Sequence, residues 1–237
     1  MSKFNYSCIS LKGKIRTENQ DSFFCCGSMP ENDSSAVSGS CGEGIFAVFD
    51  GMGGGCGGKK AAWLCSEHIS RNSDRIVGSP SEMINVIFEM NGIVCGYAAE
   101  NKYSVCGSTA VMASVKDGIA YISNIGDSRA YLFSSGLYRL SCDHVRISSG
   151  RKGLTQYVGI PERELMLEPY FGSVKLECGS RLLLCSDGLS DMTDDDFISS
   201  CLSMKSSVGD ICLALSDGAM KNGGRDNITV IVIEREC

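Results

Sequence analysis

Strand-like and helix-like segments occupy separate blocks of this sequence, and their order restricts the fold more than any other feature. Gly44–Asp50 is a short apolar run that predicts a buried strand, and two segments with helical spacing follow it, Lys59–Arg71 and Ser81–Lys102. Strand-like runs then fill Ser108–Leu140, and a β-branched segment predicts a last strand at Asn227–Glu234. Because the helices are segregated from hairpin-linked strands, we expect an α+β fold with mainly antiparallel sheets.

Turn and cap residues place several element boundaries. Lys116–Gly118 and Ser134–Gly136 have the composition of hairpin turns. Ser81 is expected to cap the second long helix, and Thr193, which three aspartates follow, is expected to cap a later one. Ser28–Glu43 is small and polar, so we expect a long loop there.

The composition limits the domain count and excludes several functional classes. A chain of 237 residues without a Pro-, Gly- or Ser-rich linker predicts a single domain over residues 1–237. The net charge of −6 argues against a nucleic-acid partner. The only histidines, His68 and His144, are too few for a three-histidine zinc site. No apolar run is long enough to span a membrane, so no membrane partner is expected.

The chain contains 14 cysteines, an unusually high number. They could form a secreted disulfide framework or stay reduced in the cytosol. The N-terminal residues do not form a signal peptide, no Cys-x-x-Cys pair occurs, and several cysteines lie in apolar runs, where a free thiol packs as a small hydrophobe. We therefore expect reduced thiols and a cytoplasmic protein.

Aspartates follow strand-like runs at several places. Four stand where an apolar run passes into glycine or a turn, and they are Asp50, Asp127, Asp187 and Asp226. A fifth, Asp21, opens a strand-like run. Any one of them could simply form a turn, but five that converge would supply the oxygen ligands that Mg²⁺ or Mn²⁺ prefers. Two such ions about 3.5–4 Å apart can activate a water molecule and clamp a phosphoryl group.

Several motifs together resemble the metal-dependent protein serine/threonine phosphatases of the protein phosphatase 2C type. In chain order the matching segments are Arg16–Asp21, Phe46–Gly54, Gly107–Ala110, Gly126–Ala130, Ser186–Gly188 and Asp226–Thr229. The sequence Asp50-Gly51-Met52-Gly53-Gly54 is similar to the corresponding motif of the bacterial members of this family. The resemblance implies a central β-sandwich of two mainly antiparallel sheets, flanked by pairs of helices in α-β-β-α layers.

The resemblance also implies a metal site. Asp50 would bridge two Mn²⁺ or Mg²⁺ ions, and the Gly51 carbonyl would bind one of them. Asp187 and Asp226 would complete the ligands of the other ion, and Asp21 would bind directly or through water. Asp127, together with Asp187, would hold a weaker third ion.

The implied activity is hydrolysis of phosphoserine and phosphothreonine in proteins. Arg16 would bind the substrate phosphate, because its guanidinium matches phosphate oxygens and stays charged. A metal-bridging hydroxide would attack phosphorus without a phosphoenzyme, so Arg16, Asp21 and Asp50 are the expected catalytic residues. The expected partners are phosphoproteins, with a serine/threonine kinase that shares these targets, and the enzyme is expected to be a monomer.

Two features depart from the resemblance. Some relatives have a histidine after the Asp-Gly pair as a general acid, whereas this chain has Met52. The flap beside the active site, which is usually longer, is reduced to Val145–Gly153. Metal-bound water would therefore have to protonate the leaving oxygen, and substrate selection and third-metal affinity are the properties that the short flap is expected to alter.

Two other functions remain open at this point. Gly53–Lys59 fits most of a phosphate-binding P-loop and would suggest an NTPase, although Lys60 stands where Mg²⁺ needs a hydroxyl. A metal-binding module that senses phosphoproteins without catalysis is the second alternative. Such a module would be marked by a lost ligand, and all the expected ligands are present.

Overall fold

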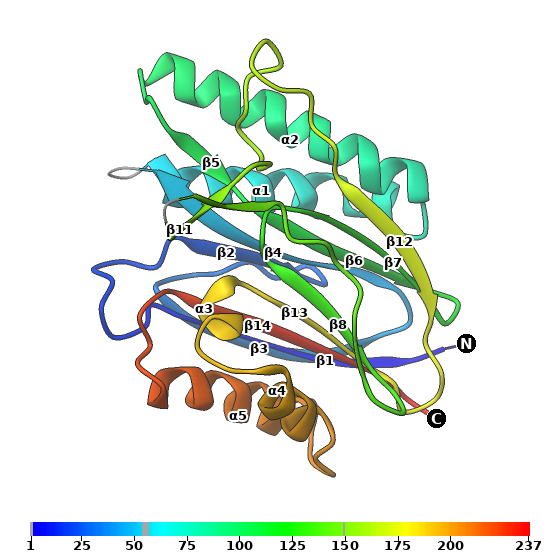
Figure 1. Cartoon of the computed structure of the whole chain (residues 1–237). Coiled ribbons are helices and arrows are strands. Elements are labelled where there is room, and N and C mark those ends of the chain that lie inside the picture. The colour runs from blue at the N-terminus through cyan, green and yellow to red at the C-terminus, as the bar shows by residue number, and fades with distance from the viewer. Residues whose placement is uncertain (1, 54–56, 149) are drawn as a thin grey trace.

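The computed structural model describes residues 2–53, 57–148 and 150–237 and has four layers. Two mainly antiparallel sheets pack face to face, and helices cover the outer face of each (Figure 1). This arrangement confirms the predicted α+β sandwich in α-β-β-α layers.

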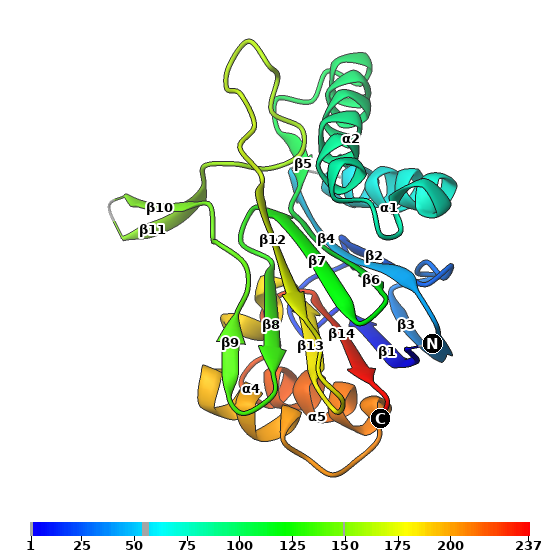
Figure 2. The ribbon, with the colours of Figure 1, turned by 90° about the vertical axis from the view of Figure 1, so that its right-hand side faces the viewer.

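Each large sheet has six strands. The first has the order β3 (Ser34–Cys41), β1 (Phe4–Leu11), β14 (Ile228–Arg235), β13 (Arg181–Cys185), β8 (Arg129–Phe133) and β9 (Leu137–Arg139). The second has the order β12 (Tyr170–Lys175), β7 (Ile119–Ile125), β6 (Ala110–Lys116), β4 (Gly44–Gly53) and β2 (Asp21–Cys25), with β5 (Cys106–Ser108) paired to β4. A separate hairpin of β10 (Val145–Ser148) and β11 (Arg151–Leu154) stands away from the sandwich (Figure 2).

The helices bury the outer faces of the sheets. On the second sheet lie α1 (Gly57–Ile76) and α2 (Pro80–Glu100), and on the first lie α3 (Asp187–Ser190), α4 (Asp195–Leu202) and α5 (Val208–Lys221). Three apolar clusters fill the spaces between the four layers. Phe46 and Ile231 belong to the central cluster, which lies between the sheets. Because burial of apolar area is the main driving force for folding, these clusters fix the strand ends that carry the aspartates.

Three local expectations were wrong. The loop expected over Ser28–Glu43 contains β3, which lies at a sheet edge with half-exposed side chains and therefore carries little hydrophobic signal. The later helix is capped by Asp194 rather than Thr193, because the Asp194 carboxylate accepts a hydrogen bond from the Phe197 amide at 2.8 Å. The second long helix begins at Pro80 after Ser79, not at Ser81, since proline fits the first turn of a helix.

The expectation of reduced thiols also needs correction at one place. Cys178 and Cys237 form a disulfide, whereas the other cysteines in the described part of the chain are free. The β13–β14 register pairs Arg181 with Glu234, and continuing it by three residues places Cys178 opposite Cys237. Within the described residues, no helix is long and apolar enough to cross a membrane.

Candidate metal centre

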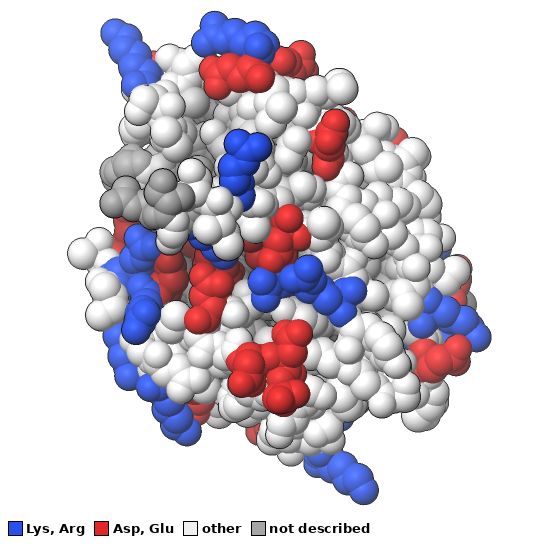
Figure 3. Space-filling view, viewed as in Figure 1, with Lys and Arg blue, Asp and Glu red and all other residues white. Residues whose placement is uncertain are grey.

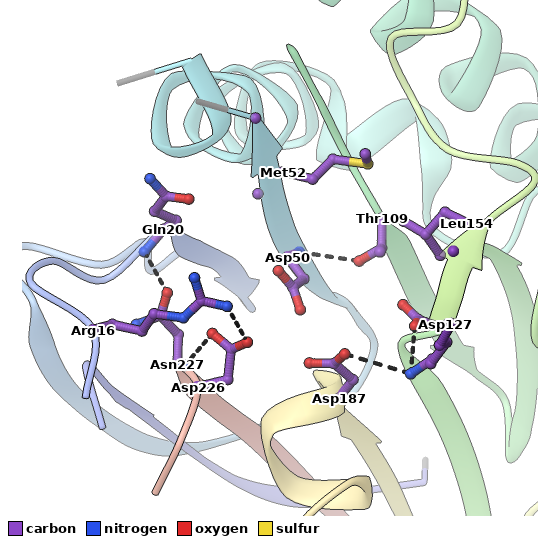
Figure 4. A pocket seen from close by; sticks show the side chains of 14 residues that line it. Arg16, Gln20, Asp50, Met52, Thr109, Asp127, Leu154, Asp187, Asp226 and Asn227 are labelled. Atoms are coloured by element: carbon purple, nitrogen blue, oxygen red, sulfur yellow. Dashed lines mark hydrogen bonds and ion pairs between the residues drawn. The ribbon is translucent and has the colours of Figure 1, made fainter. Parts of the chain in front are cut away.

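One edge of the sandwich gathers the predicted site residues. Asp50, Asp127, Asp187 and Asp226 line a single pocket together with Arg16 and Gly51 (Figure 4). Acidic side chains also gather next to basic ones on the face of the molecule that Figure 3 shows. The structure therefore brings together residues that lie up to 210 positions apart in the sequence.

Asp21 and Asp50 face each other across two neighbouring strands. They are a directly opposed pair in the β2–β4 register, and such side chains lie on the same face of a sheet. The Asp21 Oδ2 atom accepts hydrogen bonds from Ser186 Oγ at 2.8 Å and from Thr229 Oγ1 at 2.7 Å. The Asp21 Oδ1 atom is buried and has no hydrogen-bond partner among the described residues. One oxygen of a buried carboxylate is therefore left for a ligand.

Gly51 lies at a close crossing of three backbone segments. Strand β4 continues past Asp50 to Gly53, so Asp50 lies inside the strand rather than at its end. A Cβ atom at position 51 would overlap the Gly58 carbonyl and would lie 2.6 Å from the Gln20 carbonyl oxygen. Only glycine fits here, which explains the Asp-Gly sequence in terms of packing.

Arg16 and Asp226 form an ion pair at one end of the pocket. Arg16 Nη2 lies 2.5 Å from Asp226 Oδ2, and the Arg16 side chain is 55% exposed. The neighbouring Asn227 holds the loop that carries Arg16. Its Oδ1 accepts from the Gln20 amide at 2.9 Å, and its Nδ2 donates to the carbonyls of Lys12 and Glu18 at 2.8 and 3.0 Å.

Asp127 and Asp187 lie at the other end of the pocket. Asp187 starts α3 instead of ending β13, because the strand stops at Cys185. Asp127 lies in the turn between β7 and β8 and is buried. Lys152 Nζ from the β10–β11 hairpin lies 2.7 Å from Asp127 Oδ2 and 3.5 Å from Asp187 Oδ2.

The central carboxylates resist ionisation. Burial, and to a lesser degree the charges of Asp187 and Asp226, raises the pKa of Asp21 to about 7, although its two hydroxyl donors oppose the shift. Burial followed by the charge of Asp21 holds the pKa of Asp50 well above its usual value. Burial followed by the charge of Asp127 raises the pKa of Asp187 to about 6. Crowded carboxylates of this kind gain stability when a cation neutralises them.

The donor set fits hard divalent cations. The pocket lining supplies Gly51 and the carboxylates of Asp50, Asp127, Asp187 and Asp226. Asp21 does not line this pocket, and its unpartnered Oδ1 belongs to the strand beside Asp50. Within the part of the chain that the structure describes, no three His, Cys, Asp or Glu side chains are already arranged around a metal position. Arg16 and Lys152 instead contact carboxylate oxygens of the residues predicted as ligands.

Sequence reasoning missed the hydroxyl and amide groups that support these acids. Thr109 Oγ1 accepts a hydrogen bond from the Asp50 amide at 3.0 Å and bonds to Ser128 Oγ at 2.7 Å. Ser10 Oγ bonds to Thr229 Oγ1 at 2.8 Å behind Asp21. Thr109, Ser128, Ser186, Asn227 and Thr229 all lie inside the motif segments, so their position next to the acids was the available signal. Lys152 carried no such signal.

The comparisons with known proteins agree with this geometry. The family model described as Protein phosphatase 2C matches residues 9–147, more than half of the chain. The chain belongs to this family. It is 27% identical to "Serine/threonine phosphatase stp" of Listeria monocytogenes, over 95% of this chain and 93% of that protein. It is 26% identical to "Serine/threonine protein phosphatase PstP" of Mycobacterium tuberculosis, over 97% of this chain and 44% of that protein.

Solved structures show the same fold. One is PppA, described as a key regulatory component of T6SS in Pseudomonas aeruginosa, with a TM-score of 0.82, 26% identity and coverage of 98% of this chain and 97% of that chain. Another is the catalytic domain of PstP in complex with two manganese ions, with a TM-score of 0.83, 24% identity and full coverage of both chains. The protein phosphatase 2C member described here is thus a metal-dependent protein serine/threonine phosphatase, as the motifs predicted.

The family assignment removes the P-loop alternative. Lys59 Nζ forms an ion pair with Asp33 Oδ1 at 2.8 Å and lies 3.8 Å from Glu18 Oε2. Part of the Gly53–Lys59 motif, residues 54–56, lies outside the described residues, as does the last glycine of the Asp50–Gly54 motif. The order of elements, with antiparallel sheets on both sides of the interior, is that of a phosphatase 2C sandwich.

Proposed function

We propose that the pocket at the sheet edge removes phosphate from phosphoserine and phosphothreonine residues of proteins, with two Mn²⁺ or Mg²⁺ ions held by its carboxylates. The observation that carries this proposal is the placement of Arg16 in a pocket lined by partly buried carboxylates with raised pKa values. Asp21, with its unpartnered oxygen, lies opposite Asp50 on the neighbouring strand. The manganese ions of the PstP catalytic domain, a neighbour in fold, support the number of ions.

Each residue has a distinct task in this proposal. Asp50 and the Gly51 carbonyl would hold one cation, Asp50 would share the other with Asp187 and Asp226, and Asp21 would contribute its free oxygen directly or through water. When bound, such cations lower the pKa of a coordinated water and stabilise charge on the phosphoryl oxygens. The chain would hold them by rigid strand ends and by hydroxyl groups that orient Asp21.

Arg16 would bind and orient the phosphate. Its side chain is more than half exposed at the mouth of the pocket, and its guanidinium already contacts a carboxylate. A cation bound to Asp226 would compete for that carboxylate and leave the guanidinium donors for phosphate oxygens.

The leaving oxygen needs a proton, and neither histidine lines the pocket. Met52, not histidine, follows the Asp-Gly pair in the pocket lining. His144 Nδ1 lies 3.2 Å from the Gly126 amide, and His68 Nε2 lies 2.8 Å from Glu89 Oε2 on the helix layer. We therefore propose that solvent supplies the proton.

Other parts of the prediction rest on the sequence alone. We propose that residues 1–237 form one catalytic domain, and that the substrates are phosphoproteins shared with a serine/threonine kinase. The monomeric state and the cytoplasmic location stay predictions. A third cation at Asp127 and Asp187 would have to displace Lys152.

The deciding experiment is release of phosphate from phosphoserine and phosphothreonine peptides, with ATP as a competing substrate. We expect turnover with Mn²⁺ or Mg²⁺, none in EDTA, and recovery on metal add-back. Asp187→Asn and Asp226→Asn should each lower kcat by at least about 100-fold, since even outer partners of metal ligands cost 10–100-fold. Lys59→Ala, outside the pocket, is the matched control and should retain its activity. Full activity in EDTA would contradict the metal mechanism, and a wild-type chain that binds Mn²⁺ but never turns over would favour the non-catalytic module.

A further inference from the structure

Lys152 lies among three carboxylates at the end of the pocket away from Arg16. Its ammonium is 2.7 Å from Asp127 Oδ2, 3.5 Å from Asp187 Oδ2 and 3.4 Å from Asp191 Oδ1. The Asp127 side chain is only 7% exposed, so its charge is removed from water and needs a counter-ion close by. Lys152 is that counter-ion.

The element that carries Lys152 has little else to hold it. The β10–β11 hairpin pairs with neither large sheet and projects from the sandwich (Figure 2). A two-stranded hairpin is only marginally stable by itself. Its base is fixed by backbone bonds from the His144 amide to the Gly126 carbonyl and from the Thr155 amide to the His144 carbonyl, both 2.9 Å. Further along the hairpin, the contacts of Lys152 join β11 to the body of the protein.

The charges in the pocket are arranged from end to end. Arg16 neutralises Asp226 at one end, and Lys152 neutralises Asp127 and Asp187 at the other. Within the described residues, no Lys or Arg forms an ion pair with Asp50 or with Asp21 on the neighbouring strand, so the need for added cations is greatest there. A divalent ion at Asp127 and Asp187 would have to take the place that an ammonium already fills.

We propose that Lys152 is a tethered cation that fills the Asp127–Asp187–Asp191 position in place of a third divalent ion and thereby holds the short hairpin beside the pocket. This inference rests on the proposed metal-dependent function of the same pocket. It assigns the reduced flap a task, which is to supply one of the site's positive charges from the chain itself.

The test measures metal binding and hairpin motion without substrate. We expect Lys152→Met, which removes the charge and keeps the length, to bind one more Mn²⁺ per chain than the wild type, as measured by the electron paramagnetic resonance of free Mn²⁺. Without metal, amide hydrogen exchange over residues 145–154 should become about tenfold faster or more in this variant, because local opening becomes easier. Lys152→Arg should restore the wild-type count and exchange rate.

Matched variants separate this effect from general damage. Lys175→Met removes an exposed lysine that pairs with Glu177 and should change neither readout. Adding Asp127→Asn to Lys152→Met should abolish the extra Mn²⁺. An unchanged ion count, unchanged hairpin exchange, or an extra ion in Lys152→Arg would each overturn the proposal. Failure of the proposed phosphatase function would appear differently, as absence of turnover by the wild-type chain.

Discussion

Single charged residues determine how this pocket is prepared for its ligands. Arg16 and Lys152 each hold an outer carboxylate, while Asp21 and Asp50 face one another without a cationic partner among the described residues. Metal and phosphate binding as proposed would therefore involve an exchange of ion partners rather than the filling of an inert cavity. In such a site, each charged side chain would affect the binding of both the metal ions and the substrate phosphate.

Replacement of Arg16 tests this exchange. Arg16→Ala should raise KM for phosphopeptides about 10–100-fold, the worth of a charge-assisted hydrogen bond, with a smaller effect on kcat. Mn²⁺ affinity should not fall, because Asp226 loses a competing cation. Steady-state kinetics and a metal titration of the same preparation check both points. Arg16→Lys keeps the charge but not the guanidinium fork, so its KM should lie between those of the wild type and Arg16→Ala. An unchanged KM in Arg16→Ala would refute the phosphate role.

Gly51 offers a test of packing in the same region. Gly51→Ala should lower the free energy of unfolding by about 1–3 kcal/mol, since the added methyl group overlaps backbone atoms that cannot move aside. Gly92→Ala is the control, because a Cβ there meets nothing within 4 Å and the site is in helix α2. That variant should instead gain about 0.5–1 kcal/mol from helix propensity. Urea unfolding of the two variants measures the contrast, and equal stabilities would count against the close crossing at Gly51.

The elements convert a linear pattern into a three-dimensional site through their register. The β2–β4 register places Asp21 opposite Asp50. β13 and β14 are antiparallel neighbours, and Asp187, which follows β13, and Asp226, which precedes β14, lie at the same end of this pair. At the other end of the same strand pair, the disulfide joins Cys178 to Cys237. The two strands that lead to these acids are thus linked covalently at the end opposite the acids.

Loss of the disulfide should lower the free energy of unfolding and leave kcat nearly unchanged. Cys178→Ser should lower the free energy of unfolding by about 2–4 kcal/mol, because the bond closes a loop with a sequence separation of 59. With the metal site at the far end of the strands, kcat at moderate temperature should change little. Thermal unfolding with and without reductant measures the effect. The denatured, unreduced wild type should show two fewer reactive thiols than its 14 cysteines, and a full count would mean that no disulfide forms.

At the scale of the whole molecule, a stable sandwich supports an electrostatically unfavourable edge. Three apolar clusters bind the four layers together, whereas the pocket gathers carboxylates whose pKa values are raised. Stability and function therefore oppose each other at this edge until cations bind. The metal-free protein should be the less stable form.

Metal binding should consequently raise the melting temperature. At a Mn²⁺ concentration about 100 times the Kd, the stabilisation of about 2.7 kcal/mol corresponds to a rise in Tm of roughly 5–10 °C for a chain of this size. Differential scanning calorimetry with Mn²⁺ or EDTA measures it. Asp50→Asn removes a carboxyl group whose ionisation its surroundings disfavour, so it should melt no lower than the wild type in EDTA and respond little to Mn²⁺. A wild-type Tm that does not change when Mn²⁺ is added would argue against a metal site here.

Local patterns in the sequence predict single elements and mark the acids, whereas the four layers followed from the resemblance to the phosphatase family. Apolar periodicity marked β4, α1 and β14, and the Asp-Gly pairs marked the pocket. β3 was missed since an edge strand of small polar residues has no apolar face to detect. Lys152 and the Cys178–Cys237 pair depend on which distant segments meet, and only strand register and hairpin placement determine that. The site residues stay predictions until the variants above are measured.

The opposition of Asp21 to Asp50 has a consequence for insertions and deletions. Side chains alternate between the two faces of a strand, so one added or lost residue reverses the faces of the side chains on one side of the change relative to those on the other. An insertion between Asp21 and Ser22 would keep Phe23 in the core and turn Asp21 away from Asp50. The pocket edge would lose this pair of facing carboxylates although no side chain in it had been replaced. Natural variation in chain length should therefore be found in the turns of this protein, and be absent from β2 and β4.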